Sequence, residues 1–136
     1  MSQDLGERPD TAALIPPDTP PPTELVVEDV TTGEGPEASD GDRLLVDYVG
    51  VRWSDGGEFD ASWERGQPLE VVLGAERVIP GWEQGLLGMQ VGGRRILTIP
   101  PELAYGDRGA GDVIGAGETL VFVIDLVSIE EDHDQA

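Results

Sequence analysis

The side chains in this sequence that could do chemistry are one carboxylate and a set of aromatic rings. Asp60 follows Phe59 in a β-rich stretch, and Trp82 follows an Ile-Pro-Gly turn at the start of a short apolar segment. The sequence contains no Cys, no Lys and a single His near its end. It therefore excludes thiol catalysis, a Ser-His-Asp set and a phosphate-binding loop with a following Lys. No cluster has zinc or calcium spacing, so a reaction here must need no nucleophile, metal or general base.

Rotation about an Xaa-Pro bond meets this restriction, because it makes and breaks no covalent bond. Its barrier is about 18–20 kcal/mol, and uncatalysed exchange takes tens to hundreds of seconds. A roughly thousandfold acceleration needs about 4 kcal/mol of preferential stabilisation of the twisted amide. An apolar cage disfavours the charge separation of the planar amide, and one or two aimed hydrogen bonds add about 0.5–1.5 kcal/mol each. The aromatic and aliphatic residues, with Asp60 and two Tyr, fit these requirements.

Charge and hydropathy limit the partners and the location of the protein. The 136 residues include 28 acidic and 8 basic residues, all of the latter Arg, and the net charge is −20. Such a surface repels phosphate backbones, which argues against nucleic-acid binding. No apolar run approaches the roughly 18 residues of a membrane span, and the acidic N-terminus lacks the apolar region of a secretory signal. We expect a cytoplasmic protein that binds neither nucleic acid nor membrane.

The sequence divides into a central domain and two tails. Residues 1–23 hold six of the eleven Pro and few large apolar residues, which predicts a disordered or extended acidic leader. The leader could serve as a linker or contact a partner, but a solvated tail is the simpler interpretation. Residues 24–130 form the predicted domain, and residues 131–136 an acidic C-terminal tail.

The central part is predicted to be mostly β-strand, with one short helix. Strands are expected at Leu25–Val30, Arg43–Trp53, Leu69–Leu73, Arg94–Ile99 and Thr119–Ile129. The Asp55-Gly56 pair that follows the second of these strands is a hairpin signal. A helix is expected over Gly81–Met89, because Trp82, Leu86 and Met89 lie on one helical face. This pattern predicts an α+β fold in which a helix covers one face of an antiparallel sheet.

Five short motifs occur in a fixed order along the chain. They are Val46–Gly50 (VDYVG), Gly57–Ser62 (GEFDAS), Val78–Trp82 (VIPGW), Ala104–Gly106 (AYG) and Leu120–Phe122 (LVF). As an ordered set they resemble the FKBP-type peptidyl-prolyl cis-trans isomerases, from about Leu25 to Ile129. The resemblance implies a curved antiparallel sheet, or half-barrel, wrapped around one short α-helix. It also implies a single-domain, monomeric isomerase that acts on proline-containing peptides or unfolded proteins without cofactor or metal.

The resemblance also assigns the site. It makes Asp60, Tyr105, Tyr48 and Phe122 the catalytic residues, and Phe59, Leu69, Val71, Val78, Ile79, Trp82 and Ile114 the substrate-binding residues. Trp82 would form the floor under the proline ring, and the backbone N–H of Ile79 would hold the substrate carbonyl that follows proline. Asp60 would act electrostatically on the twisting carbonyl rather than by proton transfer.

These residues also have a purely structural interpretation, and the sequence departs from the family at two places. Tyr48, Phe122 and Trp82 are residues that fill any core, and Phe59 could be a strand-end cap. The Gly115-Ala116 step stands where a Pro-Pro step is common, and Leu69 stands where an aromatic residue is common. We therefore expect a more mobile flap over residues 106–118, and weaker catalysis or macrolide binding. The alternative function is a proline-binding or chaperone-like module that uses the same pocket without useful turnover.

Overall fold

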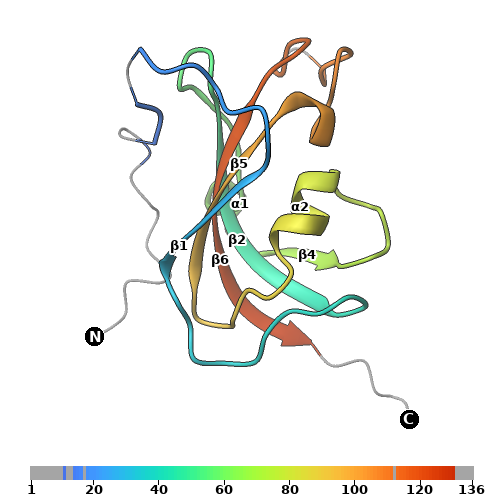
Figure 1. Ribbon diagram of the computed structural model, residues 1–136. Coiled ribbons are helices and arrows are strands. Elements are labelled where there is room, and N and C mark those ends of the chain that lie inside the picture. The colour runs from blue at the N-terminus through green and yellow to red at the C-terminus, as the bar shows by residue number, and fades with distance from the viewer. Residues whose placement is uncertain (1–10, 12–13, 17, 112, 131–136) are drawn as a thin grey trace.

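The computed structural model describes residues 11, 14–16, 18–111 and 113–130. Within them, six antiparallel strands form one sheet in the order β1-β5-β6-β2-β3, with β4 beside β2. The strands are β1 (Val26–Thr31), β2 (Arg43–Arg52), β3 (Glu58–Ala61), β4 (Leu69–Val72), β5 (Arg94–Ile99) and β6 (Leu120–Glu130). Figure 1 shows the sheet curving around the helix α2 (Pro80–Gly85). The predicted α+β arrangement, a curved antiparallel sheet around one short helix, is confirmed.

The long strand β6 forms the centre of the sheet because it pairs with both β5 and β2. Its residues from Leu120 to Leu126 are all buried. Leu120, Phe122, Ile124 and Leu126 belong to the main core under α2, whereas Val123 belongs to a small cluster with Val49 and Ala61. Successive side chains on a strand point to opposite faces, so these four residues share the face of β6 that lies toward α2.

The helix α2 is shorter than predicted. It ends at Gly85 rather than at Met89, and Gly88 with a φ of 81° turns the chain after it. Leu86 and Met89 are nevertheless fully buried in the main core together with Trp82. A Cβ on Gly81 would lie 2.5 Å from Ile99, and one on Gly85 would lie 2.7 Å from Leu97. Glycine at both positions lets the helix backbone rest directly on β5.

Two short helical segments were not predicted. They are α1 (Ser62–Arg65), which follows β3, and the 3₁₀ helix η1 (Pro101–Leu103). The predicted hairpin after β2 is present, because the N–H of Arg52 donates to the carbonyl of Gly57 and Gly56 has a φ of 72°. No helix in the described part of the chain is long and apolar enough to cross a membrane.

The described part of the leader contacts the domain. Leu14 packs against the outer-face cluster of Val49, Ala61 and Val123. The indole Nε1 of Trp53 donates to the carbonyl of Thr19 at 3.3 Å. The remaining leader residues, 1–10, 12–13 and 17, and the predicted C-terminal tail at 131–136 lie outside the described residues.

Candidate active site

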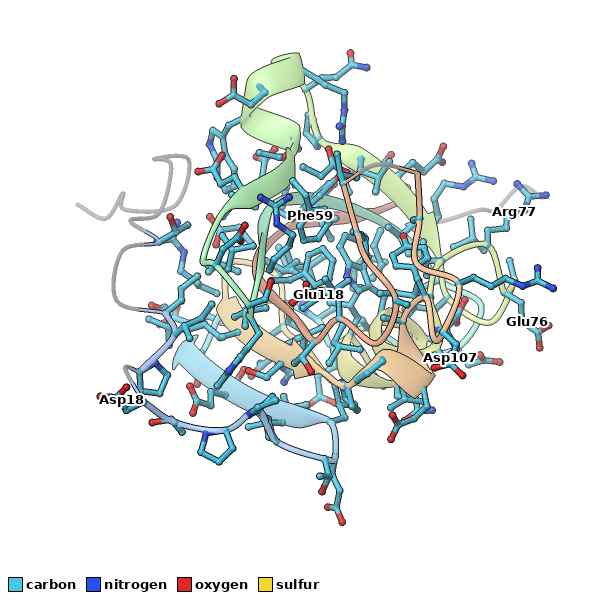
Figure 2. All side chains as sticks on the ribbon, turned by 90° about the horizontal axis from the view of Figure 1, so that it is seen from above. Asp18, Phe59, Glu76, Arg77, Asp107 and Glu118 are labelled. Carbon is cyan, nitrogen blue, oxygen red and sulfur yellow. The ribbon has the colours of Figure 1, made fainter. Side chains whose placement is uncertain are left out.

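A cavity of about 400 Å³ opens between α2 and the sheet. Its lining residues come from β2, β3, β4, α2, β6 and two loops: Tyr48, Phe59, Asp60, Leu69, Glu76, Arg77, Val78, Ile79, Trp82, Ala104, Tyr105 and Phe122. In Figure 2, which views the molecule from above, Phe59 points toward the middle of the molecule, whereas Glu76 and Arg77 extend outward from its edge. The cavity therefore has an aromatic interior and a charged rim.

The aromatic rings contact one another edge to face. The ring centroids of Tyr48 and Trp82 are 5.1 Å apart, those of Trp82 and Phe122 are 5.2 Å apart, and those of Phe59 and Phe122 are 5.5 Å apart. Such pairs add about 0.5–1.5 kcal/mol beyond the area that they bury. A Cβ on Gly50 would lie 2.7 Å from the Phe59 ring and 2.8 Å from the Phe122 ring. The glycine of the Val46–Gly50 motif thus makes room for both rings.

Trp82 belongs to the core and to the cavity at once. Its side chain is in the main core cluster with only 4% exposure, and it also lines the cavity. Its Nε1–H is buried and has no hydrogen-bond partner in the described residues. Leaving a buried donor unpaired is unfavourable, so core packing alone explains this tryptophan poorly. Its position favours a role as the cavity floor.

A polar triad of Tyr48, Asp60 and Arg65 lies at one edge of the cavity. The Tyr48 hydroxyl donates to Asp60 Oδ2 at 2.6 Å, and Arg65 donates from Nη1 to Asp60 Oδ1 at 2.7 Å. Arg65 Nη2 also donates to the Tyr48 hydroxyl at 2.6 Å. The triad fixes the orientation of the Asp60 carboxylate, whose side chain is 41% exposed. Asp60 thus presents an oriented negative charge at the edge of the aromatic interior.

Arg65 is not among the site residues that the sequence predicts. Arg65 is the last residue of α1, which Gly66 caps with a φ of 77°, and its placement also depends on the hydroxyl of the buried Ser62. Ser62 Oγ accepts from the N–H of Tyr48 at 2.9 Å and donates to Asp47 at 2.8 Å. This pair of hydrogen bonds joins α1 to β2 and brings Arg65 to the triad. The only sequence signal was an arginine directly before a glycine, shortly after Asp60.

Alkaline pH is expected to destabilise the protein through Tyr48. Burial first, and then the hydrogen bond to Asp60, raise the pKa of Tyr48 from 10.0 to about 12. Since the folded pKa lies above the unfolded value, the stabilisation is complete below pH 10.0 and is lost as the pH rises to about 12. Urea unfolding across this range measures the effect. Tyr48→Phe should remove this part of the decline, and an equal decline in that variant would contradict the assignment.

The loop before α2 supplies the rim residues Val78 and Ile79. The N–H groups of Gly74 and Glu76 donate to the two carboxylate oxygens of Glu83 at 2.6 and 3.0 Å. Glu83 lies in the first turn of α2, so the helix holds its own preceding loop. In the described part of the chain the N–H of Ile79 makes no hydrogen bond, which leaves this donor available at the cavity rim.

Glu83→Ala is expected to lower stability by about 1–3 kcal/mol, because two charge-assisted hydrogen bonds to the rim loop are lost. The same change should raise KM for an Xaa-Pro peptide, because binding must then order the loop. Urea unfolding and steady-state kinetics measure the two effects. Gln84→Ala, at the exposed next position, serves as the control. Equal behaviour of the two variants would show that the Glu83 contacts do not hold the rim.

The structure brings nine of the eleven predicted site residues to the cavity and leaves Val71 and Ile114 outside its lining. Val71 shares a face of β4 with Leu69 but is 1% exposed and lies in the core. Ile114 is 4% exposed and also packs in the core. Tyr105 is 39% exposed, and burial followed by the charge of Asp60 raises its pKa. The predicted site residues do not include the lining residues Glu76, Arg77 and Ala104, although Ala104 belongs to the Ala104–Gly106 motif.

No group of three or more His, Cys, Asp or Glu side chains in the described residues is placed to hold a metal ion. The cavity contains aromatic rings, one oriented carboxylate, two hydroxyls and a backbone donor. This set can exclude water from a bound amide and can aim partial charges at it. It is suited to changing a conformation rather than to breaking a bond.

Comparison with known proteins agrees with this chemistry and defines the class. Residues 35–127 match the family model described as FKBP-type peptidyl-prolyl cis-trans isomerase. The chain belongs to this family, and its activity is peptidyl-prolyl cis-trans isomerisation. The FK506-binding protein of Streptomyces anulatus is 58% identical over 110 residues, which cover 80% of this chain and 89% of the relative.

Further relatives and solved structures support the same assignment. The probable FK506-binding protein of Corynebacterium glutamicum is 52% identical, with 80% of this chain and 90% of the relative covered. The crystal structure of AtFKBP13 has a TM-score of 0.73 at 40% identity, covering 78% of this chain and 93% of that one. FkpA from Escherichia coli has a TM-score of 0.73 at 42% identity, covering 80% of this chain and 49% of that one.

Proposed function

We propose that this FKBP-type isomerase holds the proline ring of an Xaa-Pro segment against the indole of Trp82. The observation that carries the proposal is that five aromatic rings line one cavity, with the oriented carboxylate of Asp60 at its edge. The substrates are proline-containing peptides and unfolded proteins. Tyr48, Phe59 and Phe122 form the walls, and Leu69 and Val78 complete the apolar surface.

The proposed mechanism relies on desolvation and on a few aimed hydrogen bonds. The apolar walls displace water from the amide, which disfavours its planar, charge-separated form relative to the twisted form. The N–H of Ile79 donates to the carbonyl that follows proline, and the Tyr105 hydroxyl contacts the peptide from the opposite loop. Asp60, oriented by Tyr48 and Arg65, acts on the twisting carbonyl without proton transfer. Together these terms need supply only about 4 kcal/mol for a roughly thousandfold acceleration.

The test is the cis-trans isomerisation rate of a short Leu-Pro peptide with the wild-type protein. Acceleration that FK506 inhibits in proportion to its occupancy of the protein supports the proposal. If the folded wild-type protein binds the peptide without accelerating rotation, the proline-binding or chaperone-like alternative replaces it. Holdase activity toward an unfolded protein, measured by light scattering, then tests that alternative.

FK506 binding is part of the proposal, since two relatives are named as FK506-binding proteins. We propose that FK506 occupies the same cavity with reduced affinity. Leu69 makes one wall smaller than an aromatic residue would, and Gly115-Ala116 lacks the restraint of proline in the flap. Both features lower the contact that a rigid macrolide can make with the protein.

Leu69→Phe is expected to tighten FK506 binding by roughly threefold to tenfold, because a ring adds apolar contact on the cavity wall. Isothermal titration calorimetry of both proteins measures the ratio of Kd values. Val127→Phe introduces the same ring at an exposed position outside the cavity, and should leave Kd unchanged. A Leu69→Phe protein with the wild-type Kd would show that this wall does not limit affinity.

A monomeric state and a cytoplasmic location also remain proposals. The net charge of −20 favours the monomer, because two copies repel each other. Sedimentation equilibrium at low and high salt tests the oligomeric state, and cell fractionation tests the location.

A further inference from the structure

The flap contains a small hairpin whose second limb, residues 113–118, supports the loop that carries Tyr105. The N–H of Gly117 donates to the carbonyl of Gly106 at 2.9 Å, directly beside Tyr105. The backbone groups of Ala110 and Ile114 exchange two hydrogen bonds, of 2.8 and 3.1 Å. The side chain of Ile114 is buried in the main core. The position of this limb therefore sets the position of one wall of the cavity.

Two side chains of the β2–β3 hairpin tie this limb at both ends. Arg52 Nη1 donates to the carbonyl of Val113 at 3.0 Å, next to Ile114. Ser54 donates from its backbone N and from Oγ to the two carboxylate oxygens of Glu118, at 2.9 and 2.8 Å. Glu118, labelled in Figure 2, directly follows Gly117. The limb is thus held from the hairpin before and after its proline-free Gly115-Ala116 step.

The surroundings of Arg52 keep its guanidinium directed at the flap. Its Nε pairs with Asp55 at 3.0 Å, and its side chain is only 22% exposed. A Cβ on Gly57 would collide with Arg52 Nη2, so the bare backbone of Gly57 provides the space that the guanidinium occupies. The hairpin sequence therefore fixes the geometry of the contact with Val113.

We propose that Arg52 and Ser54 are positioning residues that hold the flap and Tyr105 in the arrangement that retains an Xaa-Pro peptide. The proposal rests on the proposed function of the cavity. Without these contacts the flap must be ordered when the peptide binds, so KM rises by the inverse of the fraction of ordered molecules. Because neither residue lines the cavity, kcat should change little.

The test compares Arg52→Gln and Ser54→Ala with Arg43→Gln. Arg43 lies at the opposite end of β2 and pairs with Glu70 at 2.9 Å, so its replacement makes the same charge change away from the flap. Amide hydrogen exchange by NMR measures the order of the flap at Ile114 and Gly117. Steady-state kinetics with a Leu-Pro peptide separates KM from kcat.

In both Arg52→Gln and Ser54→Ala we expect exchange at Ile114 and Gly117 to accelerate at least roughly fivefold, while exchange in β2 and β6 stays unchanged. We expect KM to rise roughly threefold to tenfold and kcat to stay within about twofold. Arg52→Lys, which keeps one donor for the Val113 carbonyl, should restore part of the loss. Arg43→Gln should match the wild type in every measurement.

Three results would overturn the proposal. The first is equal flap exchange in Arg52→Gln and Arg43→Gln. The second is faster exchange with an unchanged KM, which would separate flap order from peptide binding. The third is a loss in kcat alone. If the wild-type protein does not accelerate the peptide, the proposed function fails, and the Kd of the peptide from NMR titration replaces KM in the same comparison.

Discussion

Trp82→Ala is expected to lower kcat/KM for a Leu-Pro peptide by roughly tenfold to a hundredfold per folded molecule. The reason is that fully burying an apolar group the size of the proline ring contributes about 1.5–3 kcal/mol, and the variant lacks the floor that buries it. The same change should cost about 3–5 kcal/mol of folding free energy, because Trp82 is also a core residue. Urea unfolding and kinetics below the unfolding transition measure both effects.

Met89→Ala separates the two roles of Trp82. Met89 is 2% exposed and lies in the same core cluster, but it does not line the cavity. Its truncation should cost about 2–5 kcal/mol of stability and leave kcat/KM per folded molecule near the wild-type value. Equal losses of activity in the two variants would mean that Trp82 acts through the core alone. Trp82→Leu, which keeps part of the apolar volume, should lie between the wild type and Trp82→Ala.

Asp60→Asn is expected to lower kcat/KM by roughly tenfold to a hundredfold. Hydrogen bonds and contacts that involve a charge contribute about 1.5–3 kcal/mol, and the amide keeps the shape of the carboxylate but not its charge. The effect on stability should be small, because the Asp60–Arg65 pair is more than 40% exposed on both sides and exposed pairs contribute about 0–1 kcal/mol. Peptide isomerisation rates and urea unfolding measure the two quantities.

Two further variants test the assignment to Asp60. Glu70→Gln removes a carboxylate that pairs with Arg43 outside the cavity, and should leave the rate unchanged. Arg65→Gln keeps the charge of Asp60 but removes the 2.7 Å contact that orients it, so a smaller loss is expected. If Asp60→Asn has the wild-type rate, the charge of Asp60 does not contribute to catalysis, and its role in β3 is structural.

The strands were predictable because their sequences carry the signal locally. Runs of β-forming residues bounded by turn residues predict all five strands to within one residue of the structure, and Arg94–Ile99 matches β5 at both ends. The sequence around the four-residue strand β3 is β-rich, but so short a segment shows little periodicity and does not predict the bounds of a strand. The helix α1 was missed for the same reason.

The order of motifs predicts most residues of the cavity lining, and the residues that differ between the predicted set and the lining do so for physical reasons. Val71 lies on the same face of β4 as the lining residue Leu69, but it is buried in the core rather than at the cavity. The type of a residue does not show how deeply its side chain is buried. Arg65 joins the site through contacts with Tyr48 and Asp60, which are 17 and 5 residues away in sequence. The tethers from Arg52 and Ser54 span 61 and 64 residues. Such pairings depend on the folded arrangement and leave no local pattern.

The contact of α2 with β5 limits how this protein could be made more thermostable. Replacing a helical glycine with alanine usually gains about 1 kcal/mol of helix propensity, which makes Gly81 and Gly85 obvious targets for engineering. Here an added methyl group would lie 2.5 Å from Ile99 or 2.7 Å from Leu97, and overpacking of this kind costs about 1–3 kcal/mol. The added methyl group would push against β5 from α2, the helix that carries Trp82. Stabilising substitutions are better placed elsewhere, because the two glycines lower the helix propensity of α2 but allow it to pack closely on β5.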